Sequence, residues 1–118
     1  MKRTDSRRSL RMGDEIRRVL GELLLDGVQD PRLELVSITG VRLNADLRVA
    51  EVLYTAMGGP ERTKAAGQAL AHAGGFLRTE MGKRLKLRYL PELRFKPDDF
   101  LEDMLHGTHA SADSPDSE

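Results

Sequence analysis

The sequence predicts an α+β fold in which one three-stranded sheet packs on helices, in the order helix, strand, strand, helix, helix, strand. The length of 118 residues fits a single domain. Two apolar runs joined by a short turn indicate a hairpin, and segments with helical periodicity stand on both sides of it. With 39% hydrophobic and 32% charged residues the core must be small, which favours one sheet covered by helices.

The first helix is predicted to begin near Asp5 or Ser6 and to end at about Leu25. Gly27 offers a C-terminal stop, and Pro31 prevents the helix from continuing. The apolar positions share one sector of the helical wheel, which should face the core. They are Met12, Ile16, Val19, Leu20 and Leu23.

Three arginines, Arg7, Arg11 and Arg18, fall on the opposite side of this helix. Ordinary pairing within the helix could occupy Arg18, because Asp14 and Glu22 stand four residues before and after it. Arg7 and Arg11 have no acidic residue so placed. These two side chains are therefore predicted to be free to bind a ligand.

Two strands are predicted over Leu35–Leu43 and Leu47–Met57. The turn-forming residues of Asn44–Asp46 join them, which predicts an antiparallel hairpin. Alternation in the first run places Val36 and Ile38 on one face of the strand, and Ser37, Thr39 and Val41 on the other.

A second helix is predicted from about Pro60 to Ala73, because proline suits the first helical turn after the Gly58-Gly59 pair. Small residues on its buried side would let it lie close to the sheet. The helical pattern resumes from Phe76 as a third helix, and a short strand, Pro91–Phe95, follows it.

Gly74 and Gly75 interrupt the helical pattern, and a glycine inside a helix costs up to ~1 kcal/mol relative to alanine. The pair predicts a kink or break at Ala73, Gly74 and Gly75. A helix that restarts there would present unpaired backbone N–H groups to an anion such as phosphate. The alternative is that the glycines only let the chain bend over the sheet.

The formal net charge of zero hides a segregation of the charges. Seven basic residues lie in residues 1–18 and seven more in 76–96, whereas 97–118 holds seven acidic residues and no Lys or Arg. Residues 1–96 therefore hold all 19 basic and 12 of the 19 acidic residues, a net charge of +7 that suits a polyanion. Solvated helix faces are the simpler explanation for either basic segment alone.

The predicted order αββααβ resembles that of a type II KH domain, an RNA-binding module that clamps nucleotides with a GxxG loop. This chain has no GxxG. In its place stands Ala73-Gly74-Gly75, which is similar to the AxG kink of the ribosome-binding factor A family. The stretches "DPRLELVSIT" and "GFLRTEMGKRLKLRYLPELRF" also resemble segments of that family, and the similarity covers roughly residues 5–96.

The resemblance implies a single type II KH-like domain over residues 1–96. It does not extend to residues 97–118, whose own composition predicts an acidic, disordered tail. It also implies an assembly factor without catalytic activity that assists late maturation of 16S rRNA, including its 5′ end. The implied partner is that rRNA within the free small (30S) ribosomal subunit or its precursor, with ribosomal proteins and assembly GTPases as further candidates. A monomer that needs no cofactor is expected.

Phosphate contacts and close backbone approach are predicted where both lines of reasoning agree. The candidate RNA-binding residues are Arg7, Arg11, Gly74, Gly75, Arg78, Lys83, Lys86 and Arg88. Tyr89 could stack on a base, but a tyrosine beside a strand is expected to be partly buried. Recognition of shape and phosphate should therefore dominate over base stacking.

Two other functions are considered. A DNA-binding module could use the basic first helix, although that helix also carries a long apolar face and no helix-turn-helix spacing surrounds it. A small RNA-processing enzyme could bind Mg²⁺ through Asp98, Asp99, Glu102 and Asp103, but their place in a tail argues against it. The chain has no cysteine, and its N-terminus lacks the apolar core of a signal peptide, so a cytoplasmic protein without a metal site is expected.

Overall fold

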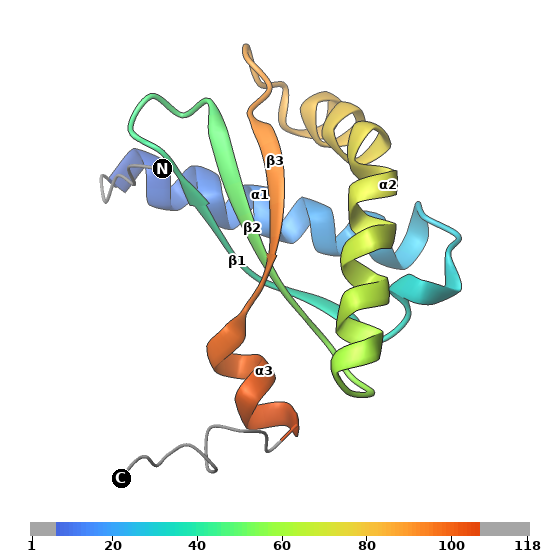
Figure 1. Ribbon diagram of the computed structural model, residues 1–118. Helices are drawn as coiled ribbons and strands as arrows, with labels where there is room; N and C mark the ends of the chain where they lie inside the picture. The colour runs from blue at the N-terminus through green and yellow to red at the C-terminus, as the bar shows by residue number, and fades with distance from the viewer. Residues whose placement is uncertain (1–6, 107–118) are drawn as a thin grey trace, which may run out of the picture.

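Two long helices pack against a three-stranded sheet (Figure 1). The structure is a computed structural model that describes residues 7–106, without the side chains of residues 103, 105 and 106. Its elements are α1 (Arg7–Asp26), the 3-10 helix η1 (Pro31–Leu33), β1 (Val36–Leu43), β2 (Val49–Ala56), α2 (Pro60–Leu85), β3 (Glu92–Pro97) and α3 (Asp99–His106). The predicted α+β class, with one three-stranded sheet on helices, is confirmed.

The sheet has the order β1-β2-β3, so that β2 is central. β1 and β2 run antiparallel, which confirms the predicted hairpin, and Val36 pairs with Ala56 at its open end. The carboxamide oxygen of Asn44 accepts from the backbone N–H groups of Arg48 and Val49 and so closes the turn. β3 runs parallel to β2, because α2 carries the chain back across the sheet between them.

β1 contains a bulge, and its register against β2 shifts between Ile38 and Gly40. An extra residue in one strand reverses the faces of the residues that follow it. Val41 therefore packs against the core together with Val36 and Ile38. The prediction that Val41 lies on the face opposite Ile38 is wrong, since simple alternation does not survive a bulge.

The core lies between the sheet and the two long helices. α1 contributes the apolar stripe predicted for it, with Ile16, Val19, Leu20 and Leu23 all buried. Ala66 and Ala69 are fully buried on α2, as expected for a helix close to a sheet. Where α1 crosses β1, a Cβ on Gly13 would lie 2.6 Å from the carbonyl oxygen of Val41, so only glycine fits that approach.

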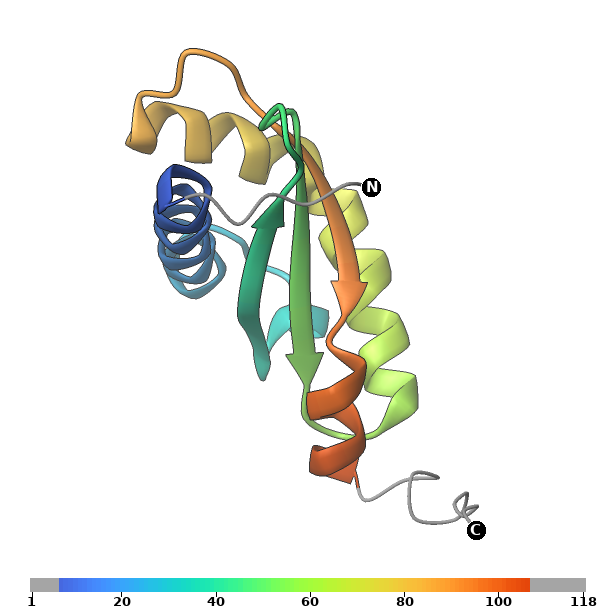
Figure 2. The same ribbon diagram turned by 90° about the vertical axis from the view of Figure 1, so that its left-hand side faces the viewer.

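α2 is one helix of 26 residues that changes direction partway along its length (Figures 1 and 2). The prediction of two separate helices is therefore wrong. The bend is compatible with a kink inside one continuous helix. Leu70 and Leu77, on either side of Gly74 and Gly75, are fully buried. Their burial stabilises the helix on both sides, and this outweighs the ~1 kcal/mol that each glycine costs.

The folded part of the chain extends beyond residue 96, so the predicted boundary between domain and tail is wrong. β3 ends at Pro97, and α3 follows it at the end of the sheet (Figure 1). Glu102 is only 8% exposed, and its carboxylate accepts from the backbone N–H of Ala56, at 2.8 Å, and from the hydroxyl of Thr63. The remainder of the predicted tail, residues 107–118, lies outside the described residues.

Each helix in residues 7–106 is too short or too polar to cross a membrane. α1 and α2 pack on the sheet, and α3 contacts the end of β2.

Candidate nucleic-acid interface

The predicted RNA-binding residues lie in two groups rather than one. Arg7 and Arg11 are in the first turns of α1, and the others are in α2 or in the loop that follows it. Arg84, near the end of α2, lies 3.7 Å from Glu22 of α1, measured from Nη1 to Oε1. Arg7 precedes Glu22 by 15 residues, or about 22 Å along a helix. The two groups therefore stand at a distance from each other, and Arg84, which sequence reasoning missed, marks where α2 meets α1.

The α1 group offers unpaired positive charge. Arg7 and Arg11 are exposed, and within residues 7–106 neither of them forms an ion pair. Arg18 donates to Glu22 at 3.1 Å, so the pairing predicted for it is confirmed. Arg7, Arg8 and Arg11 line a shallow cavity of about 430 Å³ with Met12 and Glu15. This end of α1 has the charge to contact phosphates.

Gly74 and Gly75 of α2 do not create the anion-binding helix N-terminus that was predicted for them. Helical structure continues through both of them, so no helix restarts there and no first-turn N–H groups are free for an anion. Neither glycine has a positive φ. A Cβ on Gly74 would meet the ring of Phe95 at 3.8 Å, whereas a Cβ on Gly75 would meet nothing within 4 Å. Gly75 is thus an exposed, open point of the backbone, and close approach of RNA to it stays a prediction.

Arg78 has a structural role in this molecule. Its guanidinium donates to the backbone oxygens of Leu90 and Pro91, from Nη2 at 2.8 Å and from Nε at 3.0 Å. Pro91 is buried, so these bonds fix the loop between α2 and β3. The remaining donors of Arg78 could still reach a phosphate, but its main contacts are already made.

The loop after α2 carries the densest cluster of candidates. Lys86 ends α2 with a left-handed backbone, at φ 53°, and Lys83 lies 3.3 Å from Glu80. Arg88 places its guanidinium 5.5 Å from the ring centre of Tyr89, a cation–π contact. Tyr89 is 72% exposed, so the prediction that it is partly buried is wrong. The Arg78 bonds hold the loop in place, which presents the tyrosine ring to the solvent beside the guanidinium of Arg88.

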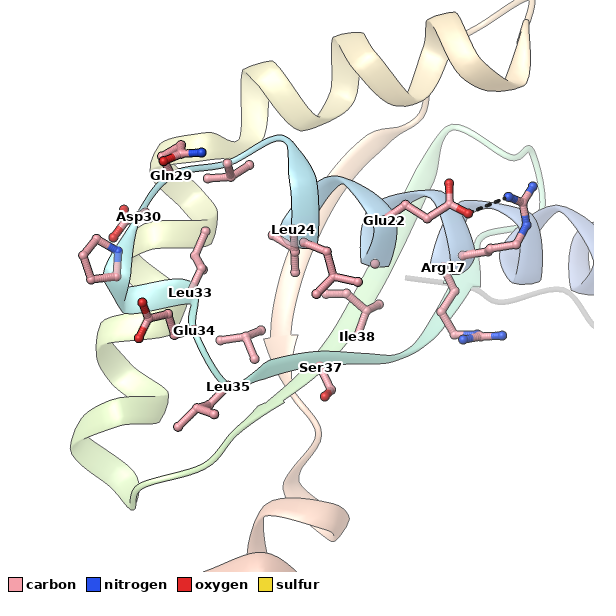
Figure 3. Close-up of a pocket in the computed structure, with 16 residues that line it drawn as sticks. Arg17, Glu22, Leu24, Gln29, Asp30, Leu33, Glu34, Leu35, Ser37 and Ile38 are labelled. Atoms are coloured by element: carbon pink, nitrogen blue, oxygen red, sulfur yellow. Dashed lines mark hydrogen bonds and ion pairs between the residues drawn. The ribbon is translucent and has the colours of Figure 1, made fainter.

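A larger cavity of about 980 Å³ opens between α1, η1 and β1, and sequence reasoning missed it (Figure 3). We call it the α1–β1 groove. It is lined by Arg17, Arg18, Gly21, Glu22, Leu24, Leu25, Val28, Gln29, Asp30, Pro31, Leu33, Glu34, Leu35, Val36, Ser37 and Ile38. The "DPRLELVSIT" stretch forms one wall, so the signal for this groove was in the sequence but was interpreted only as the approach to a strand.

The α1–β1 groove is electrostatically unlike the basic groups. Glu22, Asp30 and Glu34 contribute carboxylates to it, and many of its walls are leucine, valine or isoleucine. Hydrogen bonds from the side chain and backbone of Arg32 lower the pKa of Asp30, which keeps this carboxylate charged. With three carboxylates against two arginines, and many apolar side chains, the groove is a weaker candidate for phosphate contacts than the two basic groups.

Among the described side chains, the acidic residues near the C-terminus do not form a preorganised metal site. Asp98 accepts from the hydroxyl of Thr39 at 2.7 Å, and Glu102 is buried against Thr63. In the described part of the chain, no group of three or more His, Cys, Asp or Glu side chains could hold a metal ion. His72 is exposed on α2.

Comparisons with known proteins identify the family to which this chain is similar. A family model described as ribosome-binding factor A matches residues 8–109. A ribosome-binding factor A from Clostridioides difficile (strain 630) is 46% identical over 96 residues, covering 80% of this chain and 75% of the relative.

Solved structures show the same likeness. The solution structure of a Thermotoga maritima protein described as a putative ribosome binding factor A has a TM-score of 0.69 at 36% identity, over 79% of this chain and 89% of that one. A homology model of the Thermus thermophilus ribosome binding factor A, fitted into the cryo-EM map of its complex with the 30S subunit, has a TM-score of 0.61 at 33% identity, over 71% of this chain and 88% of that one.

Proposed function

Because the chain belongs to the ribosome-binding factor A family, we propose that it is an assembly factor that binds the small ribosomal subunit or its precursor. In this proposal it assists late maturation of 16S rRNA, including the 5′ end, and acts by binding rather than by catalysis. The Thermus thermophilus relative is described in a complex with the 30S subunit, which supports the choice of partner.

The observation that carries the proposal is the loop after α2. Lys86 and Arg88 lie there without a carboxylate partner in the described residues, next to the exposed ring of Tyr89. Cations bind phosphates, and an exposed aromatic ring can stack on an unpaired base. This loop therefore suits single-stranded or looped RNA better than a regular duplex.

The α1 group supplies a second, separate contact. Arg7 and Arg11 would bind phosphates about 16 to 22 Å along α1 from Glu22, where α2 meets α1. Two separated basic contacts suit a large folded RNA, whose backbone passes the protein more than once. DNA binding by α1 alone is less well supported, because its apolar side is buried against the sheet and α2.

A monomeric state, a cytoplasmic location, and ribosomal proteins and assembly GTPases as additional partners are further parts of the proposal. They follow from assembly on a ribosomal subunit and rest on the family relationship. The short acidic stretch of α3 supports binding over catalysis, since Asp98 and Glu102 are already engaged within the fold.

Sedimentation of cell lysate on a sucrose gradient tests the proposal. The protein should migrate with free small subunits and be absent from translating ribosomes. If the protein stays at the top of the gradient at low salt, apart from the subunits, the proposal is contradicted. Purified protein incubated with precursor rRNA and Mg²⁺ should leave the RNA intact, and cleavage would show an enzyme instead.

A further inference from the structure

We propose that the α1–β1 groove docks an extended segment of a small-subunit ribosomal protein, which adds a strand to the open edge of β1. The proposal rests on the proposed function, because the partner is part of the subunit, but it concerns a surface that the RNA contacts do not use. Addition of a strand to a sheet edge is a common way to bind a peptide.

The edge of β1 is open along the groove. β1 is an outer strand of the sheet, and no other strand in residues 7–106 pairs with it beyond β2. The backbone oxygen of Leu35 accepts from Met57 at 3.3 Å, so Leu35 and Ser37 point their backbone groups toward β2. Val36 and Ile38 alternate with them, so their backbone N–H and C=O groups point away from β2, toward the open edge of β1.

A second contact supports this alternation. Val36 pairs with Ala56, whose N–H donates to Glu102 instead of to β1. The pair is therefore one without mutual hydrogen bonds, and the N–H and C=O of Val36 are directed into the groove. An incoming strand would satisfy them, as the main chain of a bound peptide does at other sheet edges.

Exposed leucines flank this edge. Leu25 is 85% exposed and Leu35 is 64% exposed, and both line the groove. Leu35 also has a left-handed backbone, at φ 67°, which is unfavourable for a leucine. A strained residue that holds an apolar side chain in solvent, next to an open strand, is typical of a binding site.

The charges of the groove select the occupant. Arg18 pairs with Glu22, and Asp30 pairs with Arg32. Arg17 and Glu34 have no ion pair in the described part of the chain, and they lie at opposite ends of the groove (Figure 3). The matching ligand is an extended peptide with apolar side chains in its middle, a carboxylate toward Arg17 and a cation toward Glu34. RNA fits poorly, because its phosphates would face Glu34 and the leucines.

Site-directed crosslinking identifies the occupant. The natural chain has no cysteine, so Leu35→Cys introduces a single thiol that can carry a photoactivatable crosslinker. Illumination of this variant on purified small subunits should yield an adduct that protease removes and ribonuclease does not. Phe100→Cys is the control and should give no such adduct, since Phe100 is 73% exposed on α3 and does not line the groove. An adduct with rRNA, or no adduct from a bound subunit, would overturn the proposal.

A pair of binding measurements separates protein contact from RNA contact. Leu25→Glu should weaken binding to small subunits about tenfold and should leave affinity for protein-free 16S rRNA within about twofold, because only the subunit carries the peptide. Phe100→Glu is the control, since Phe100 is 73% exposed on α3, outside the groove. Leu25 is largely in solvent, so the variant should fold, and its melting temperature checks this.

The outcomes distinguish the two proposals. If the wild-type protein does not bind subunits, the proposed function fails and this inference fails with it. If the wild type binds but Leu25→Glu binds equally well, only the groove proposal fails. Equal weakening on subunits and on protein-free rRNA would make the groove an RNA contact and would overturn the peptide as its occupant.

Discussion

Arginines of this chain differ in what they can bind, although their chemistry is the same. Arg78 is held by two backbone oxygens, and Arg18 by Glu22. Arg94 is paired with Glu92, and its hydrogen bond lowers the pKa of that carboxyl. Arg7 and Arg11 have no such partner within residues 7–106. Sequence spacing identified the free pair, because partners within a helix follow its period, but it could not identify the loop carbonyls that bind Arg78.

Gly75→Ala is expected to keep or raise stability and to weaken binding to RNA. The helix continues through Gly75, its φ is not positive and its Cβ would meet nothing, so alanine should stabilise α2 by up to ~1 kcal/mol. A methyl group at an open point of the backbone would keep a phosphate further away. Melting temperature and affinity for 16S rRNA measure the two effects. Unchanged affinity in a folded variant would leave Gly75 with a structural role only.

Lys86→Gly should likewise raise stability while it weakens binding to RNA. The left-handed backbone of Lys86 costs about 1–2 kcal/mol, which glycine avoids, while its greater freedom in the unfolded chain offsets about half of the gain. A rise of several degrees in melting temperature is expected, together with weaker binding to 16S rRNA. Lys83→Ala is a control that removes a charge without changing the end of the helix. A lower melting temperature for Lys86→Gly would contradict the strain argument.

The elements follow from local sequence except where distant contacts decide. The hairpin, the buried stripe of α1 and the start of α2 at Pro60 were predictable, since turn residues, helical period and proline act locally. The bulge in β1 was not, because two sets of apolar residues separated by it both reach the core. The continuity of α2 depends on burial of Leu70 and Leu77 across the fold, which no local rule contains.

α3 was missed because its main anchor is a buried carboxylate that binds groups far away in the sequence. Glu102→Ala should lower the free energy of unfolding by about 1–3 kcal/mol, since the N–H of Ala56 and the hydroxyl of Thr63 would lose their acceptor. Glu102→Gln is the matched control, because its amide keeps an acceptor oxygen for Ala56. Urea unfolding measures both. Equal stability of Glu102→Ala and the wild type would mean that α3 contributes little to the fold.

Charge over the whole chain explains how an interface can be predicted while its details cannot. Segregation of the basic residues is visible in the sequence, and it identified both groups of candidates. Their separation along α1, the exposure of Tyr89 and the α1–β1 groove depend on how helices and strands meet. Residue types therefore indicated the class of ligand, and the packing of α1, α2 and β1 determines where each ligand can bind.

Binding to the small subunit should depend strongly on salt. If about four to six phosphates are neutralised by the two basic groups, the logarithm of the binding constant should fall against the logarithm of salt concentration with a slope of roughly −3 to −5. Titrations between low and physiological salt give this slope. Arg7→Ala should make it shallower by about one, whereas Arg18→Ala, whose partner is Glu22, should change it less. A slope near zero for the wild type would contradict phosphate contacts.

The acidic C-terminal segment is the remaining electrostatic feature of the chain. Because α3 includes part of it, fewer carboxylates are left that could compete with RNA. Four of its seven carboxylates belong to residues 98–103, at the start of α3, and only Asp113, Asp116 and Glu118 follow His106. Residues 1–106 carry 19 basic and 16 acidic residues, so three carboxylates would have to compete with RNA for a weakly positive domain. Physiological salt screens such an attraction over about 8 Å.

Truncation after His106 is therefore expected to change affinity for an unrelated RNA by less than about twofold, even at low salt, and to leave the melting temperature unchanged. Truncation after Lys96 is the comparison, and it should lower the melting temperature because it also removes Glu102 and the contact from Asp98 to Tyr54. Fluorescence anisotropy with a labelled RNA and thermal unfolding measure the two quantities. A several-fold gain in affinity after the shorter truncation would instead show that these three carboxylates mimic RNA at the basic surface, and the gain should then disappear as salt is added.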